Sequence, residues 1–310
     1  MKGDFNRIVY PRIKDKSATI LWGNGVNNYI NCNYSDYISV DDRMPSWKNL
    51  ILMVSAKSRI DTKLQIDTID LPDKDVSYPE LFSLISRYAP EEVRNLTAEI
   101  IIERSRHVNE CFSRVAKKIQ EWDVPVITTN YDLMLEQELD LENFWHGKER
   151  SDKYPFNYYA TKKGVKGPIN PTTDFAVWHC NGVVNKPISM KLDLSDYCLY
   201  TARLRDKVPL LSERFCAKDG FERTWLSPFF HNTLVIIGLG LPTSEFYLRW
   251  LLLERSVMKK EIPDQVGKGY YITAGKDDIT PGFKAFLGDT SIELIEYDSW
   301  KDMYVELFGI

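Results

Sequence analysis

The amino-acid sequence predicts an α/β protein with a mainly parallel sheet and helices on both faces of that sheet. Short apolar runs of strand length, such as "ATILW" and "TLVII", alternate along the chain with longer segments in which apolar residues recur every three or four positions. Strands buried on both faces form parallel sheets, because the helices that connect them cover those faces. The expected fold is therefore Rossmann-like, with a smaller helical and loop-rich insertion.

The elements follow one another in an order that fits this class. Strands are expected within 17–25, 124–128, 174–180, 233–240, 269–274 and 291–298, and helices within 45–58, 90–122 and 248–260, with a short helix from about Asp132. One apolar face at helical spacing is formed by Val108, Phe112, Val115, Ile119 and Trp122. We expect a single domain over residues 1–310, with a mainly helical insertion at about 59–122 and a loop-rich one at 148–172.

Composition and charge are those of a globular protein with no general affinity for nucleic acid. The 310 residues are 44% apolar and 27% charged, and the formal net charge is -4. Binding to nucleic acid depends on Lys and Arg that neutralise phosphates, so nucleic acid is an unlikely partner. One basic stretch is the exception and is typical of a solvated loop: Lys148, Arg150, Lys153, Lys162, Lys163 and Lys166.

The five cysteines are widely spaced and odd in number: Cys32, Cys111, Cys180, Cys198 and Cys216. Because no CxxC pair occurs, we expect neither a disulfide framework nor a zinc module, and no bound metal. No apolar run approaches the ~18 residues of a membrane span, and the first residues contain no apolar targeting segment. The expected protein is cytoplasmic, with reduced thiols and no membrane contact.

Polar residues follow four of the expected strands, and ligands of such sheets bind beyond the carboxyl ends of strands. The first strand end is "LWGNGVNN". Gly23 and Gly25 allow a tight turn and close backbone approach, so exposed N–H groups there can cradle a pyrophosphate. Asn28 stands where a dinucleotide-binding fingerprint has its third glycine. A plain strand–turn–helix junction is the alternative.

The second strand end is "TTNYD". Asn130 and Asp132 can bond ribose hydroxyls or hold a water molecule. The alternative is an Asx-type turn in which Asp132 begins the next helix.

The third strand end is "VWHCNG". His179 and Asn181 are expected on the same side of the strand because side chains alternate, and a histidine here can act as a general base. A structural histidine followed by an Asn-Gly turn is the alternative.

The fourth strand end is "IIGLGLPTSE". Gly238 and Gly240 open the turn, and Ser244 and Glu245 stand at the start of a helix, where they can bind an adenosine ribose. An ordinary glycine turn before a helix is the alternative.

Taken together, these segments resemble a known family. "GNGVNN", "PSWKNLI", "ITTNYDLMLE", "WHCNG" followed by "KPISM", and "IIGLGLPTSEFYLRWLL" occur in the order found in bacterial sirtuin-like proteins. The resemblance covers roughly residues 17–255. The sequence is most similar to the stand-alone modules of anti-phage defence that hydrolyse NAD, and less similar to the protein deacylases, which usually carry a four-cysteine zinc module.

The resemblance implies NAD as the substrate. Asn130 matches the asparagine that positions the water or the ribose, and Asp132 matches a carboxylate on the ribose side. The remaining contacts implied for NAD are Gly23, Asn24, Gly25 and Asn27 at the pyrophosphate, Thr129 next to Asn130, and Gly238, Gly240, Ser244 and Glu245 at the adenosine end. Because departure of the cationic nicotinamide builds positive charge on the ribose, the chemistry needs orientation and electrostatic stabilisation.

The sequence departs from the family at the catalytic histidine, which stands directly before the glycine in relatives. Here Asn181 occupies that place. Either His179 acts as the base from two residues earlier, or the site hydrolyses NAD slowly without a histidine, or the module is inactive. The expected function is an NAD glycohydrolase that depletes NAD during phage infection, under the control of a homo-oligomer or a partner defence protein. The alternative is a catalytically weak or inactive module that binds NAD or ADP-ribose as a sensor or scaffold.

Overall fold

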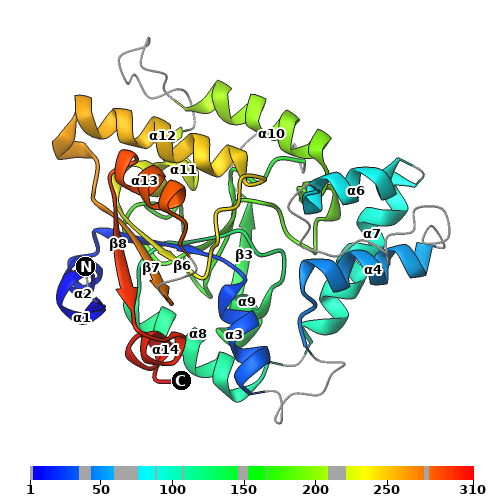
Figure 1. Ribbon diagram of the computed structural model, residues 1–310, viewed down its shortest axis with the longest axis horizontal. Helices are drawn as coiled ribbons and strands as arrows, with labels where there is room; N and C mark the ends of the chain where they lie inside the picture. Colours follow the sequence, from blue (N-terminus) through cyan, green and yellow to red (C-terminus); the bar gives the residue numbers. More distant parts are fainter. Residues whose placement is uncertain are drawn as a thin grey trace.

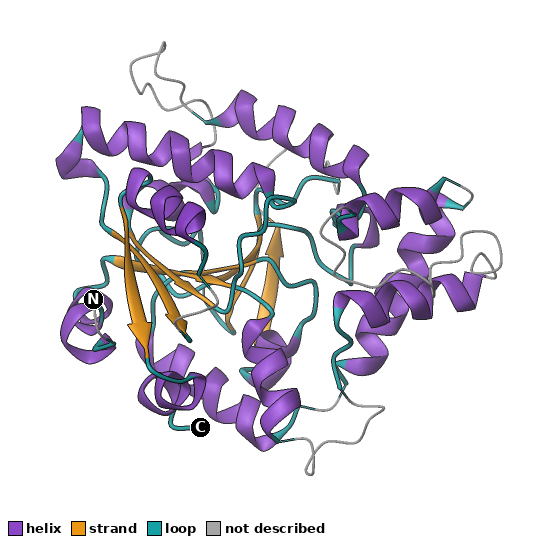
Figure 2. Cartoon of the chain, viewed as in Figure 1, coloured by secondary structure: helices purple, strands orange, loops and turns teal. Residues whose placement is uncertain are grey.

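The computed structural model describes residues 3–34, 43–58, 76–87, 89–106, 108–145, 153–165, 167–208, 221–275 and 279–310. One eight-stranded sheet forms the centre, with helices on both of its faces and a further group of helices to one side (Figures 1 and 2). Residues 59–75 of the first expected insertion, part of the basic stretch (Lys148, Arg150 and Lys166) and Cys216 lie outside the described residues.

The sheet has the strand order β3-β4-β5-β2-β1-β6-β7-β8. Its strands are β1 (Ala18–Trp22), β2 (Val126–Thr128), β3 (Leu141–Trp145), β4 (Tyr158–Lys162), β5 (Val177–His179), β6 (Thr233–Ile237), β7 (Gly269–Ala274) and β8 (Ile292–Tyr297). Neighbours from β5 to β8 are parallel, and β3 and β4 add an antiparallel edge. Counted along the chain, the parallel strands run 3-2-1-4-5-6, the order of doubly wound dinucleotide-binding sheets. The predicted α/β fold is confirmed.

Helices cover both faces of the sheet, and each face has its own apolar core. The face on which β1 contributes Ala18, Ile20 and Trp22 is covered by α1 (Phe5–Ile8), α2 (Tyr10–Lys14), α3 (Gly25–Asn33), α8 (Glu110–Trp122), α9 (Met134–Glu138) and α14 (Trp300–Phe308). The opposite face is covered by α10 (Leu194–Lys207), α11 (Leu226–His231), α12 (Phe246–Glu261) and α13 (Pro281–Asp289). The expected apolar face of α8 is buried, although Val108 precedes the helix.

The remaining helices form a separate group beside the sheet, here called the helical unit: α4 (Trp47–Ser58), α6 (Tyr78–Ser86) and α7 (Pro90–Arg104) (Figure 1). They enclose an apolar core of their own, which includes Ile51, Phe82 and Ile101. A partly buried ion pair joins the unit to a helix that covers the sheet, because Nη2 of Arg94 on α7 lies 2.8 Å from the carboxylate of Asp196 on α10. The helical unit differs in extent from the helical insertion expected at about 59–122. It begins with α4, which precedes residue 59, and it does not include α8, which packs on the sheet.

The stretch expected to be a loop at 148–172 contains a strand. β4 lies within it and pairs with β3 on one side and β5 on the other. The strand-forming residues of β4, "YYAT", are flanked by Lys, Gly and Pro, and these flanking residues dominate the composition of the stretch. β2 is also shorter than the expected strand at 124–128, since it begins at Val126.

Two further sequence expectations concern membranes and thiols. None of the helices in the described ranges is long and apolar enough to cross a membrane. The four described cysteines, Cys32, Cys111, Cys180 and Cys198, are free thiols.

The turns after β1 and β6 pack directly against each other. The N–H of Gly23 donates to the carbonyl of Ile237 at 3.0 Å, and the N–H of Gly25 donates to the carbonyl of Gly238 at 2.7 Å. A Cβ at Gly23 would lie 2.4 Å from the Gly238 carbonyl oxygen. Gly238 itself has a φ of +65°, a region that L side chains rarely adopt. The glycines are therefore required for backbone-to-backbone packing of the two turns.

Replacing Gly23 by alanine is expected to lower the free energy of unfolding by about 1–3 kcal/mol, because the new methyl group overlaps backbone atoms that cannot move aside independently. Urea denaturation of the purified variant measures the change. Gly240→Ala is the matched control, since a Cβ there meets nothing within 4 Å. Equal stabilities of the two variants would contradict the packing role of Gly23.

Candidate functional site

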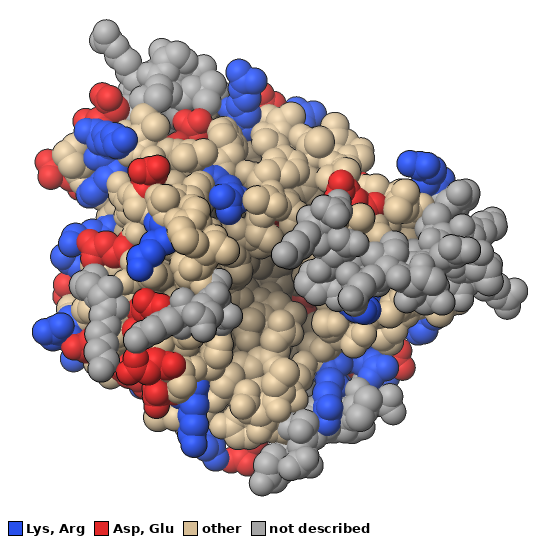
Figure 3. Space-filling model, viewed as in Figure 1, with Lys and Arg blue, Asp and Glu red and all other residues tan. Residues whose placement is uncertain are grey.

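A cavity of about 260 Å³ lies beyond the carboxyl ends of β1, β2, β5 and β6. After β1 the chain continues into α3 on one face of the sheet, and after β6 it continues toward α12 on the other, so the cavity lies at the topological switch point where such sheets bind ligands. Figure 3 shows the surface hollowed between the sheet and the helical unit. The described residues around the cavity are Asn24, Gly25, Asn28, Met44, Pro45, Trp47, Leu50, Ile101, Thr129, Asn130, Tyr131, Asp132, Asn181, Gly238, Leu239, Gly240, Pro242 and Glu245.

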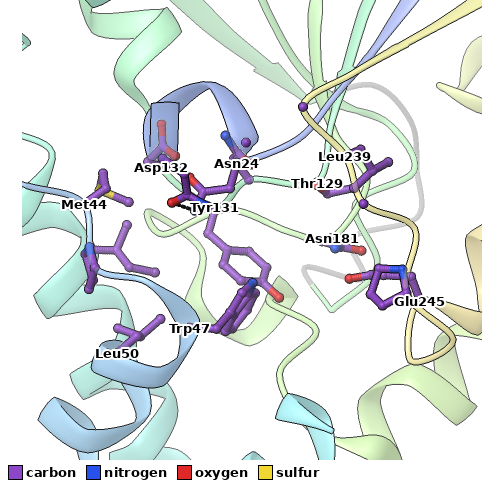
Figure 4. A pocket seen from close by; sticks show the side chains of 18 residues that line it. Asn24, Met44, Trp47, Leu50, Thr129, Tyr131, Asp132, Asn181, Leu239 and Glu245 are labelled. Atoms are coloured by element: carbon purple, nitrogen blue, oxygen red, sulfur yellow. Dashed lines mark hydrogen bonds between the residues drawn. The ribbon is translucent and has the colours of Figure 1, made fainter. Parts of the chain in front are cut away.

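Most of the residues singled out from the sequence come together here. The strand ends contribute Asn24, Gly25, Thr129, Asn130, Asp132, Asn181, Gly238, Gly240 and Glu245 to the cavity wall. Four predicted site residues are not part of the described wall: Gly23, Asn27, Ser244 and His179. In Figure 4, Asn24 and Asp132 lie toward one end of the cavity, and Asn181 and Glu245 lie together toward the other.

The first strand end leads into α3, whose N-terminus has no side-chain cap. The side-chain amide of Asn27 is buried and donates to Oδ1 of Asn24 at 3.0 Å. Since the N–H of Gly25 is already bonded to Gly238, the glycine turn offers an anion fewer donors than the sequence suggests. The uncapped first turn of α3 is the remaining source of N–H groups for a phosphate.

His179 is buried behind the cavity wall, where it positions the main chain of Asn130. Its Nδ1 lies 2.8 Å from the Asn130 carbonyl oxygen, and its Nε2 lies 2.6 Å from Oε1 of Glu136. The carbonyl accepts, so Nδ1 carries the proton, and Nε2 faces a buried carboxyl group. With both ring nitrogens bonded to protein atoms, His179 offers no nitrogen to a water molecule in the cavity.

The environment of His179 favours its charged form. Burial, the largest single influence, lowers the pKa of His179, but the charge of Glu136, its hydrogen bond and the Asn130 carbonyl together raise the pKa above its ordinary value. His179 and Glu136 are 1% and 5% exposed, so the pair is shielded from solvent. The structure therefore gives His179 the geometry of a positioning residue.

The expected alternation of side chains fails after His179 because β5 ends there. Cys180 and Asn181 lie in a turn, and Gly182 follows with a φ of +95°. The turn directs His179 toward Glu136 and Asn181 into the cavity. The sequence predicted that His179 and Asn181 lie on the same side of one strand. In the structure they point in different directions, because Asn181 lies after the end of β5.

Asp132 combines the two interpretations drawn from the sequence. Its Oδ1 accepts the N–H of Met134 at 3.1 Å, which is an Asx-type turn leading into α9. Asp132 also contributes to the cavity wall. Burial raises its pKa to about 6, against the opposing effect of the Met134 hydrogen bond.

Glu245 and Asn181 form a polar cluster with two tyrosines at the other end of the cavity. The hydroxyl of Tyr247 donates to Oδ1 of Asn181, and the hydroxyl of Tyr197 donates to Oε1 of Glu245 at 3.3 Å. Burial raises the pKa of Glu245 to about 7, and the nearby Tyr197 hydroxyl and Asn181 amide oppose the rise. A buried carboxyl group with a pKa near neutral is typical of functional sites.

The helical unit supplies an apolar wall that the sequence analysis did not assign to the site. Met44 and Pro45, just before α4, and Trp47 and Leu50 on α4 line the cavity. The Trp47 ring packs edge to face with Tyr131 at 5.8 Å between centroids. A tryptophan near the start of an amphipathic helix was the one available signal, but nothing in the sequence places that helix over the sheet.

Two lysines of the basic stretch pair with carboxylates in the structure. Lys162 lies 2.7 Å from Asp123, and Lys163 lies 2.5 Å from Asp140. In the ranges that the structure covers, no three His, Cys, Asp or Glu side chains converge as metal ligands would.

The sequence matches no model of a known protein family, and no curated protein matches it.

Glu136→Gln is expected to lower the pKa of His179, because burial is then no longer opposed by the charge and hydrogen bond of Glu136. NMR titration of the imidazole signals measures the pKa directly, and the sequence has only four histidines to assign. Glu138→Gln, on the same helix, is the control and should leave the titration of His179 unchanged. An unaltered His179 titration in Glu136→Gln would refute the pairing.

The same pair should make stability depend on pH. Since folding raises the pKa of His179, its stabilising contribution is fully present below about pH 6.5 and is lost as the pH rises through the folded pKa. Glu136→Gln should therefore cost more unfolding free energy at about pH 6 than at about pH 9, measured by urea denaturation. A cost that does not change with pH would show that His179 is neutral in the folded protein.

Proposed function

We propose that the protein binds NAD at this cavity and hydrolyses its glycosidic bond, releasing nicotinamide and ADP-ribose. The observation that carries the proposal is the charge of the cavity. Its described wall contains two carboxyl groups, Asp132 and Glu245, several amides and no Lys or Arg. Such a wall suits the cationic nicotinamide ring and the positive charge that develops on the ribose as the ring departs. The position at the switch point of a 3-2-1-4-5-6 sheet supports a dinucleotide as the ligand.

The shape of the site supports a ligand that extends past the cavity. At about 260 Å³ the cavity lies just below the ~300–1,000 Å³ that is usual for small-molecule sites, so it encloses only part of a dinucleotide. A second hollow of about 700 Å³ shares Asn28, Met44 and Pro45 with it and is lined by Arg43 and Arg104. The proposed arrangement has the reacting half of NAD inside the acidic cavity and the phosphates toward these arginines and the start of α3.

Asn130 is the residue proposed to orient the reacting groups. Its carbonyl is held by His179 and its N–H donates to Oγ1 of Thr128 at 3.0 Å, so its backbone is fixed on both sides. Its side-chain amide borders the cavity, where it can hold a ribose hydroxyl or the attacking water in one orientation. Fixing the reactants in this way lowers the barrier by removing their freedom of orientation.

In the cell, we propose that this reaction depletes NAD during phage infection. The support is the resemblance of the ordered sequence segments to bacterial sirtuin-like proteins, and most of all to the modules of anti-phage defence that hydrolyse NAD. Such an enzyme must stay silent in a healthy cell. Control by a homo-oligomer or a partner defence protein, and a cytoplasmic location, belong to the same proposal.

A second candidate is a module that binds NAD or ADP-ribose without hydrolysing it. The observation in its favour is that no histidine lines the cavity within the described part of the chain, and that Asn181 occupies the place of the family's catalytic histidine. An amide can orient water but cannot take its proton. This module would sense NAD or serve as a scaffold in a defence complex.

Asn130→Ala is expected to reduce nicotinamide release from NAD by at least about 10²-fold, because the reactants lose their fixed orientation. Chromatography of nicotinamide over a range of protein concentrations measures the rate, and calorimetry measures NAD binding. Asn33→Ala is the matched control, because Asn33 lies on α3 with its side chain exposed and away from the cavity. NAD binding without nicotinamide release by the wild type would favour the second candidate, and absence of binding would refute both.

A further inference from the structure

Glu245 has a carboxylate oxygen that nothing in the described structure satisfies. Oε1 accepts the Tyr197 hydroxyl, whereas Oε2 is buried and has no hydrogen-bond partner. The residue contributes to the cavity wall next to Asn181 (Figure 4). An unsatisfied buried carboxylate oxygen costs free energy, and a group that donates to it from the cavity removes that cost.

Among the titratable groups in its cluster, Glu245 is the one that titrates near neutral pH. The titratable neighbours on the elements packed against it are Tyr131, Tyr197 and Tyr247 and the thiol of Cys180. Burial raises the pKa of each of them, so all four stay protonated and uncharged at neutral pH. With a pKa of about 7, Glu245 alone in this cluster exchanges a proton under ordinary conditions.

The other candidates for a base are committed to different interactions. His179 has both ring nitrogens bonded to Asn130 and Glu136. Asp132 uses Oδ1 to hold the N–H of Met134 and lies toward the end of the cavity away from Asn181. Asn130 and Asn181 carry amides, which do not accept a proton from water.

We propose that Glu245 is the general base of the cavity and takes over the role of the missing family histidine. The inference rests on the proposed NAD hydrolysis. Oxygen of a water molecule bonds to C1′ of the ribose while the bond from C1′ to the nicotinamide nitrogen breaks, and that electron pair neutralises the ring. The water proton moves to the carboxylate of Glu245, which later releases it to solvent. Glu245 thus acts at the reacting end of NAD, and not at the adenosine ribose as the sequence resemblance implied.

Asn181 positions this base. Because Tyr247 donates to its Oδ1, the Asn181 amide is held next to Glu245, and its NH₂ group is the part that can donate to that carboxylate. That NH₂ group stabilises the ionised form of Glu245 and limits the rise in its pKa. In this proposal Glu245 replaces the histidine of the family as the base, and Asn181, which stands at the position of that histidine, holds Glu245 in place.

The test is the pH dependence of nicotinamide release by the purified wild-type protein and by Glu245→Gln. Wild-type kcat/KM should fall about tenfold per pH unit below about pH 7, since Glu245 must be ionised to accept a proton. Glu245→Gln should lose about 10²–10⁴-fold in kcat, retain the KM for NAD, and show no such pH slope. Formate should restore part of the rate in Glu245→Ala, where it replaces the deleted carboxylate. Glu261→Gln, an exposed carboxylate on the same helix, is the matched control.

The outcomes separate this inference from the proposed function. Release of nicotinamide by Glu245→Gln at the wild-type rate and slope overturns the assignment of the base and leaves NAD hydrolysis standing. A raised KM with unchanged kcat also overturns it, because Glu245 would then only bind the substrate. Failure of the wild type to release nicotinamide overturns both proposals.

A second variant keeps the test decisive if Glu245→Gln does not fold. Tyr197→Phe removes the hydroxyl that donates to Oε1, so the pKa of Glu245 should rise and the midpoint of the pH profile should move upward. A midpoint that stays in place overturns the inference.

Discussion

The contact between the turns after β1 and β6 is the constraint on which the site depends. The Gly25 N–H donates to Gly238, and the backbone of one turn touches the backbone of the other with no space for a side chain between them. This contact fixes where α3 begins and where the chain leaves β6 toward α12. Asn24 and Glu245, far apart in the sequence, are thereby held on two sides of one cavity. A sheet of this strand order creates the crevice, and the glycines of the two turns allow their backbones to touch at its base.

The second determinant is a buried charge pair that does not touch the cavity. His179 and Glu136 hold the main chain of Asn130 from behind, and Thr128 holds it from the other side. A buried ion pair contributes little net stability once desolvation is counted, but it fixes geometry, because any other arrangement leaves a charge without a partner. Rigidity and chemistry are thus divided between two sets of residues, with the ion pair behind the wall and the amides and carboxyl groups on it.

Much of the fold and part of the site could be predicted from the sequence, because both depend on strong local signals. Apolar runs that end in Gly23, Asn130 or Gly238 locate the carboxyl ends of strands, and parallel strands bring those ends together. The direction of His179 could not be predicted, since the alternation of side chains holds only while the strand continues. β4 was missed because its flanking residues are typical of loops. The contribution of Trp47 depends on how two separately packed groups of helices and strands meet, which no local pattern records.

The cavity wall is built by two parts of the protein, each with its own apolar core. The sheet supplies polar residues from its strand ends, and the helical unit supplies Trp47 and Leu50. Changes at Trp47 and Leu50 act mainly on the core of the helical unit, to which the segments after β2 and β5 contribute only a few residues, such as Tyr131 and Met190. In evolutionary terms, the group recognised by the apolar wall can diverge while the polar chemistry is retained. The same scaffold is thus free to acquire new ligands by changing one helix.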